Sequence, residues 1–114
     1  MSSPIFDYQA LCERVAGRLD VVEDLIQMLR SSFPSDRQQL LERLDADDSR
    51  GARDVAHRIK GQLQTLGINR AADQARCIEY LARDGHLDRA RTALADLDRE
   101  FREFEESERV RAAG

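Results

Sequence analysis

Three residues near the middle of the chain, His57, Lys60 and Gly61, have the types and spacing to serve phosphoryl transfer. His57 is one of 2 histidines, and Lys60 is the only lysine among 18 basic residues. A neutral imidazole is a competent nucleophile, and an ammonium on a flexible stem can offset the negative charge of a phosphoryl group. Their separation of three residues is about one helical turn, which brings the two side chains to the same region of a helix surface.

Gly61 is the least expected of the three residues, because glycine in an exposed helix interior costs roughly 0.8–1 kcal/mol relative to alanine. It follows His57 by four residues, so its missing side chain leaves room for another macromolecule to approach the imidazole. The alternative for each residue stays open: a tolerated glycine, a solvated surface lysine and an incidental histidine.

A helix from about residue 51 to 66 would present these groups to solvent. At ~100° per residue, its apolar side chains point within about 50° of one direction. These side chains are Ala52, Val55, Ala56, Ile59, Leu63 and Leu66. His57 points about 150° away from that direction, and Lys60, Gln64 and Arg53 lie on the same outer side, at about 90° to 130°. The stretch therefore predicts one core face and one reactive face.

The chain lacks the other parts that phosphoryl transfer needs. No metal-ligand spacing accompanies His57, and no glycine-rich phosphate loop of the P-loop or kinase kind is present. Transfer depends mainly on in-line positioning and charge compensation, typically with Mg²⁺. We therefore expect no cofactor on this chain, and we expect the metal and the second reactive group to come from a partner.

The elements that must position these residues are helices. The chain has 114 residues, which is the size of one domain, expected to span 1–114 with a core of about 7–106 and loose termini. Apolar residues recur at the spacing of three and four that is typical of amphipathic helices, and hairpin signals are missing. Four long segments with short connections predict an all-α, antiparallel four-helix bundle, with a short additional N-terminal helix covering one end.

Polar and glycine residues mark the expected helix ends. Asp7 is expected to cap the short first helix and Asp20 the second, which is either kinked at Pro34 or divided there into two. Asp48 or Ser49 would cap the third helix, and Gly67 would end it. Asn69 is expected to cap the fourth helix, and Asp84-Gly85 to end it. In the last helix a strict apolar seam runs from Leu87 to Phe104, beyond which the chain is expected to fray.

Composition and charge indicate which partners and which cell compartment to expect. The net charge is −4 with arginines interleaved among acidic residues, which disfavours binding to nucleic acid. No secretory signal or membrane-length apolar run is visible, so we expect a cytoplasmic protein that does not bind membranes. Cys12 and Cys77 stand in no metal-ligand spacing and are expected to be small core or near-core thiols.

With these residues in place, the sequence resembles the histidine-containing phosphotransfer (HPt) family of two-component phosphorelays. The family pattern is approximately A-H-x-[LI]-K-G, a few small residues, then [LIV]-G. Here residues 56–61 read AHRIKG, and Leu66-Gly67 follows. Phe33 with the leucines after it, the Asp-rich turn before the motif and Ile78-Glu79 also stand where the family has similar residues. Gln62 and Gln64 depart from the pattern, because the family usually has small residues there.

The resemblance implies a role for each residue of the motif. His57 would be phosphorylated, Lys60 would lie beside the phosphoryl group, and Gly61 would give clearance. Gln64, on the side of His57, could hydrogen-bond a phosphoryl oxygen or a partner loop, or be an ordinary exposed glutamine. Val21 and Met28 are candidates for an apolar docking patch, and peripheral core residues are their equally good alternative.

The resemblance also implies the partners. One would be the receiver domain of a hybrid sensor histidine kinase and the other that of a response regulator, each supplying an aspartate and bound Mg²⁺. This chain would be a monomer with no ATP-dependent kinase activity of its own. The alternatives are a helical-bundle adaptor that binds a receiver or kinase without carrying phosphate, a small oligomerising bundle, and, more distantly, a metal enzyme using His57 and His86.

Overall fold

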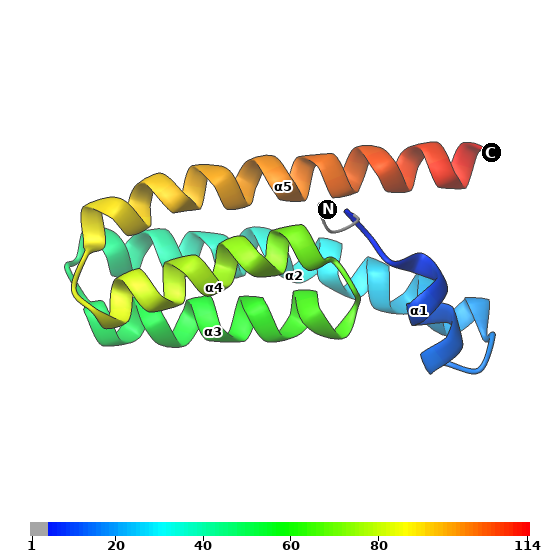
Figure 1. The fold of residues 1–114 in the computed structure, drawn as a ribbon, viewed down its shortest axis with the longest axis horizontal. Coiled ribbons are helices and arrows are strands. Elements are labelled where there is room, and N and C mark those ends of the chain that lie inside the picture. The colour runs from blue at the N-terminus through cyan, green and yellow to red at the C-terminus, as the bar shows by residue number, and fades with distance from the viewer. Residues whose placement is uncertain (1–4) are drawn as a thin grey trace.

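The computed structural model of the protein describes residues 5–114, which form five helices and no strand. They are α1 (Tyr8–Arg14), α2 (Leu19–Asp45), α3 (Ser49–Thr65), α4 (Asn69–Arg83) and α5 (Leu87–Ala113). Helices α2 to α5 run alternately up and down, and short turns join them (Figure 1). Contacts between α2 and α3, α3 and α4, α4 and α5, and α5 and α2 close the bundle. The predicted all-α bundle with a short first helix is confirmed.

The bundle is built from two long and two short helices. Helices α2 and α5 each have 27 residues, whereas α3 has 17 and α4 has 15. The long pair therefore extends past the α3–α4 turn at one end, where α1 lies (Figure 1). The backbone N–H of Asp7 donates to the carbonyl of Gly67 in that turn at 3.0 Å. The short first helix thus covers the end of the short pair, close to the C-terminal end of α3.

The core lies along the inner faces of α2 to α5. Every apolar residue that the sequence placed on the inner side of α3 is buried. The largest fully buried side chains include Phe104, Ile26, Leu40, Leu44, Ile59 and Leu97. Because each helix commits one stripe of residues to this core, the opposite stripe of α3 is fixed outward.

A left-handed glycine ends α3 and sets the direction of α4. Gly67 has φ +76°, a conformation that residues with a Cβ rarely adopt. Its N–H donates to the carbonyl of Gln64 at 3.0 Å, and the N–H of Ile68 donates to the carbonyl of Leu63 at 2.9 Å. This pair of bonds satisfies carbonyls that the helix end leaves free and buries Ile68 against the core.

Several expected boundaries differ from those in the structure. Asp20 lies in the first turn of α2, and Arg18 holds the cap position without a side-chain hydrogen bond. Ile68, and not Asn69, holds the cap position of α4. In both cases burial of the following apolar stripe, rather than a polar cap, decides where the helix begins. Pro34 lies inside α2, which is one helix on both sides of it.

Residues 5–6 and the end of α5 pack against other parts of the described chain. Ile5 and Phe6 pack against the core, and the ring of Phe6 meets that of Phe104 edge-on at 5.1 Å. The expected fraying of the C-terminal end stays a prediction, although α5 continues to Ala113. Arg111 pairs with the buried Glu108 and stacks over the ring of Tyr8, which holds this end against α1. Residues 1–4, also expected to be loose, lie outside the described part of the chain.

The two cysteines differ in their burial. Cys12 is partly buried and packs against the core, but Cys77 is exposed on α4, so the prediction for Cys77 is wrong. It follows the inner Ala75 by two positions, which turns it away from the core stripe of that helix.

Within residues 5–114, no helix combines the length and apolar character needed to cross a membrane.

Candidate functional site

His57 projects from the outer face of α3, with 66% of its side chain exposed. The neighbouring Val55, Ala56 and Ile59 are buried in the core, so the turn of the helix leaves no inward direction for the imidazole. The exposure therefore follows from the packing of α3 and not from a loose side chain. This is the placement that the helical periodicity predicted.

A carboxylate from the next helix connects His57 with Lys60. One oxygen of Glu79, Oε2, lies 2.9 Å from Nδ1 of His57, and the other, Oε1, lies 2.7 Å from Nζ of Lys60. Only 14% of the Glu79 side chain and 15% of the Lys60 side chain are exposed. Glu79 is on α4, so the pairing of α3 with α4 assembles this cluster, which we call the imidazole cluster (His57, Lys60 and Glu79).

The surroundings of Glu79 keep its carboxyl group ionised. Partial burial favours the neutral acid, but the ammonium of Lys60 and the ring of His57 outweigh burial, and the pKa of Glu79 lies below its ordinary value. An ionised carboxylate only accepts hydrogen bonds, so Nδ1 of His57 must carry the proton that it shares with Oε2. In the neutral imidazole the second ring nitrogen, Nε2, then keeps its lone pair. The cluster therefore presents one defined nucleophilic atom.

Gly61 lies on the same face as His57, one turn further along α3. A Cβ placed on Gly61 would have no neighbouring atom within 4 Å, so the space over this turn is open. The packing of the bundle does not require a glycine here, because a Cβ at this position would meet no atom within 4 Å. The clearance role expected for Gly61 stays a prediction, with this open space in its favour.

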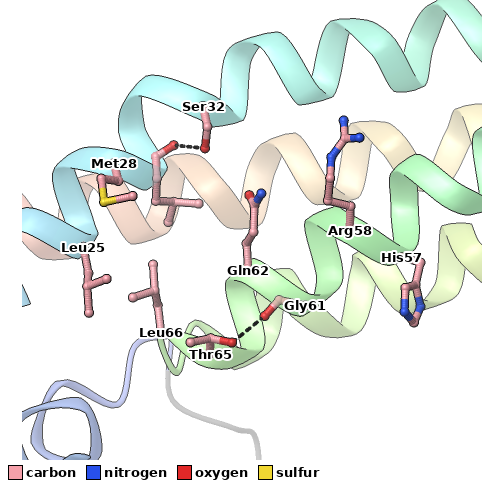
Figure 2. Close-up of a pocket in the computed structure, with 10 residues that line it drawn as sticks. Leu25, Met28, Ser32, His57, Arg58, Gly61, Gln62, Thr65 and Leu66 are labelled. Carbon is pink, nitrogen blue, oxygen red and sulfur yellow. Dashed lines mark hydrogen bonds between the residues drawn. The ribbon is translucent and has the colours of Figure 1, made fainter. Parts of the chain in front are cut away.

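A groove between α2 and α3 begins beside His57. Leu25, Met28, Leu29 and Ser32 line it from α2, and His57, Arg58, Gly61, Gln62, Thr65 and Leu66 line it from α3. Figure 2 shows His57 near one end of this groove and Leu25 with Leu66 near the other. Met28 is an exposed apolar side chain in the groove wall, with 66% exposure, whereas Val21 is partly buried and is not part of the lining.

The two glutamines after Gly61 differ in their surroundings. Gln64 is exposed and does not line the groove, whereas Gln62 does (Figure 2). The side of α3 that carries Gln62 faces α2, a neighbour that a helical wheel of α3 alone does not show. The polar contact expected between Gln64 and a phosphoryl group stays a prediction.

Glu79 is the site residue that sequence reasoning did not assign. It stands next to the buried Ile78, and the resemblance of Ile78-Glu79 to the family pattern gave Glu79 a place but no role. Its role appears only when α4 lies against α3. Across residues 5–114, no three His, Cys, Asp or Glu side chains gather as a metal site would require.

Comparison with known proteins places this site within a family. The model of the Hpt domain matches residues 24–107. Two similar proteins are the signal transduction histidine-protein kinases BarA of Shigella flexneri and of Escherichia coli strain K12. Each is 29% identical to this chain over 98 residues, which covers 86% of this chain. The chain spans about 10% of the length of these relatives. No solved structure matches it.

Proposed function

Because the chain belongs to the Hpt domain family, we propose that Nε2 of His57 accepts a phosphoryl group from a receiver-domain aspartate and passes it to another. The donor would be the receiver domain of a hybrid sensor kinase, and the acceptor would be the receiver domain of a response regulator. The two relatives are signal transduction histidine-protein kinases, which supports a place for this chain in such a pathway.

One observation carries this proposal: the hydrogen bond of 2.9 Å between Nδ1 of His57 and the ionised Glu79. It fixes the ring and its tautomer, so Nε2 is the free nucleophile on an exposed side chain. This arrangement follows the logic of a nucleophile positioned by a second group, with the reacting partner arriving from solvent.

The transfer step balances without an added acid or base. The Nε2 lone pair attacks phosphorus, the N–P bond forms, and the bond between phosphorus and the aspartyl oxygen breaks to release a carboxylate. The ring then carries a positive charge with its proton still on Nδ1, where the Glu79 carboxylate stabilises it. Attack by the second receiver's carboxylate reverses the step and restores the neutral imidazole.

Lys60 contributes by balancing Glu79. An unpaired carboxylate beside His57 would repel an incoming phosphoryl group, which is itself negatively charged. The Lys60 ammonium lies 2.7 Å from Glu79 and offsets that charge while Glu79 still orients the ring. The charge compensation expected of Lys60 would thus act partly through Glu79.

The partner completes the active site in this proposal. The receiver supplies the second reactive oxygen together with the Mg²⁺ that neutralises the phosphoryl oxygens. The open space over Gly61 and the apolar groove past Met28 would admit the receiver's surface. ATP hydrolysis has no part in the reaction of this chain.

The proposal is tested by incubating the protein with purified receiver domains phosphorylated by acetyl phosphate. We expect acid-labile, alkali-stable label on the wild type and none on a His57→Gln variant. His86→Gln is the matched control, because His86 is the other histidine, is also exposed, and makes no capping hydrogen bond. This variant should accept label at the wild-type rate.

Two results would point elsewhere. Equal labelling of the His57→Gln variant would place the phosphoryl group on another residue. Absence of label from every receiver, together with tight binding of one of them, would favour the adaptor that binds without carrying phosphate.

A further inference from the structure

We propose that three arginines beside His57 bind acidic side chains of the partner receiver and orient it for transfer. Arg50, Arg53 and Arg83, which we call the basic cluster, line one hollow together with Ser49 at the end of the bundle where α3 begins and α4 ends. The inference rests on the proposed phosphotransfer function and adds to it a residue set that selects and aligns the partner.

The basic cluster lies directly next to the imidazole cluster. Arg53 precedes His57 by four residues, which is about 6 Å along the helix axis. Arg83 follows Glu79 by four residues, and because α4 runs antiparallel to α3, it lies toward the same end as Arg53 (Figure 1). A hydrogen bond from the Ser49 hydroxyl to the carbonyl of Ala82 joins the two helices there.

These arginines do not hold the helices of the bundle together. Elsewhere, Arg37 meets Asp98 of another helix at 2.9 Å, and Arg70 meets Glu100 at 2.9 Å. Within the basic cluster the ion pairs are only between sequence neighbours, which contribute little at exposed positions. These pairs are Arg53 with Asp54 at 3.3 Å and Arg83 with Asp84 at 3.0 Å.

The remaining member, Arg50, is exposed and forms no ion pair with any residue in the range 5–114. Arg83 additionally lies over the ring of Tyr80, 5.0 Å from its centre, which restricts where its guanidinium can go. The guanidinium groups of the basic cluster therefore form no ion pair between the described helices. A guanidinium is the side-chain group best suited to bidentate binding of a carboxylate, so these three remain available for a partner.

A receiver that reaches His57 must also cover the basic cluster. A typical specific interface buries roughly 800 Å² on each partner, which corresponds to a radius of about 16 Å for a circular footprint. Arg50 is seven residues from His57, or about 10 Å along α3, and so lies inside that footprint. On the other side of His57 the groove past Met28 is mostly apolar, although Arg58 and Gln62 also line it. One basic end and one mostly apolar end favour a single docking orientation.

An acidic protein surface fits the cluster better than nucleic acid does. Asp54 and Asp84 lie beside the three arginines, so these five groups together carry one net positive charge, and the whole chain carries −4. A polyanion needs a larger basic patch or stripe, whereas a few carboxylates around a receiver's aspartate can each find one arginine.

The experiment compares second-order rates of transfer from one phosphorylated receiver domain, the fastest of a purified panel, at several salt concentrations. The test variant is R50Q/R53Q/R83Q. The control is R99Q/R102Q/R109Q, which removes the same charge from exposed arginines on α5. We expect the test variant to be about 10-fold slower at low salt and less dependent on salt, because rim charges act mainly on the association rate.

Each outcome decides a different claim. Equal rates for the test and control variants, with normal labelling of His57, would overturn this inference and leave the proposed function standing. Absence of label on the wild type would overturn both this inference and the proposed phosphotransfer function. Binding of a DNA duplex at physiological salt that is lost in the test variant alone would also overturn it, since the cluster would then serve nucleic acid.

Discussion

Two glutamates of this bundle have similar burial and different uses. Glu79 on α4 reaches α3, and Glu100 on α5 reaches α4, and their side chains are 14% and 10% exposed. Each carboxylate faces a cation from the neighbouring helix: Lys60 at 2.7 Å for Glu79, and Arg70 at 2.9 Å for Glu100. Judged by burial and distance alone, the two sites would be assigned the same role.

The two sites differ in whether the group that pairs with the glutamate keeps a free reactive atom. Arg70 turns its donors to Glu100 and to Glu103, so a permanently charged group is enclosed by two carboxylates. His57 uses one ring nitrogen on Glu79 and keeps the other free toward solvent. A buried carboxylate is thus a weak sign of function, and an exposed, reactive partner with one unused nitrogen is a stronger one.

Removing the charge of each glutamate tests this difference with the largest expected effect. Glu79→Gln and Glu100→Gln each break a partly buried ion pair, and both should lower the free energy of unfolding by about 1–2 kcal/mol. Only Glu79→Gln should slow phosphoryl transfer, by about 10- to 100-fold, because it loses the negative charge that stabilises the phosphorylated ring. Urea unfolding and single-turnover transfer from a phosphorylated receiver measure the two quantities.

The paired design keeps stability from being mistaken for chemistry. Because the two variants should be similarly destabilised, a difference in transfer rate between them cannot come from loss of folded protein. If both transfer at the wild-type rate, the imidazole cluster is only structural. If both are slow, the rate reports the integrity of the bundle rather than the group beside His57.

The sequence predicted the face of each helix better than it predicted the contacts between helices. The apolar periodicity of residues 51–66 was enough to place His57 outward, because a helix with a committed core stripe has only one remaining side. The motif and its family resemblance then pointed to His57, Lys60 and Gly61. This part of the site is local, lying on one helix within two turns.

The contact of Glu79 and the position of Gln62 in the groove could not be predicted, for one reason. The contact of Glu79 depends on α4 lying beside α3, and the position of Gln62 depends on α2 lying beside α3. A helical wheel describes one helix without its neighbours, so it gives a direction but not what lies in that direction. The predicted starts of two helices were wrong for a similar reason. Asp20 and Asn69 are residues that often cap helices, but burial of the adjacent apolar stripes sets the starts of α2 and α4.

A smaller effect is expected from filling the open space over Gly61, one turn from His57. Gly61→Leu should fold and be more stable by about 0.5–1 kcal/mol, since leucine is the better helix former and its Cβ meets no atom within 4 Å. It should transfer about 10-fold more slowly, because the side chain occupies the approach to the imidazole. Thermal unfolding and transfer rates test the two halves.

Gly51 provides the matched control for Gly61, because it is also a glycine within α3. A Cβ on Gly51 would collide with the carboxylate of Asp48, whose side chain caps the helix. Gly51→Ala should therefore lower stability by about 1 kcal/mol through loss of the cap and leave transfer unchanged. Fast transfer by Gly61→Leu would contradict the clearance role.

The smallest expected effect is a pH dependence of stability that belongs to Glu79. Lys60 and His57 outweigh partial burial and hold the pKa of Glu79 below its ordinary value of 4.5 in the folded protein. A carboxyl group with a lowered folded pKa stabilises the protein above its unfolded pKa, and this contribution is lost as the pH falls through the folded pKa. Wild-type stability should therefore decline on acidification more steeply than that of Glu79→Gln.

Urea unfolding midpoints measured between about pH 3 and pH 7 give this difference directly. The wild type and Glu79→Gln should differ most at the neutral end and converge as Glu79 becomes protonated at the acidic end. The many other carboxylates titrate alike in both proteins and cancel in the subtraction. A constant difference across the range would mean that Glu79 binds its proton equally well in both states, so that Lys60 and His57 do not stabilise its charge.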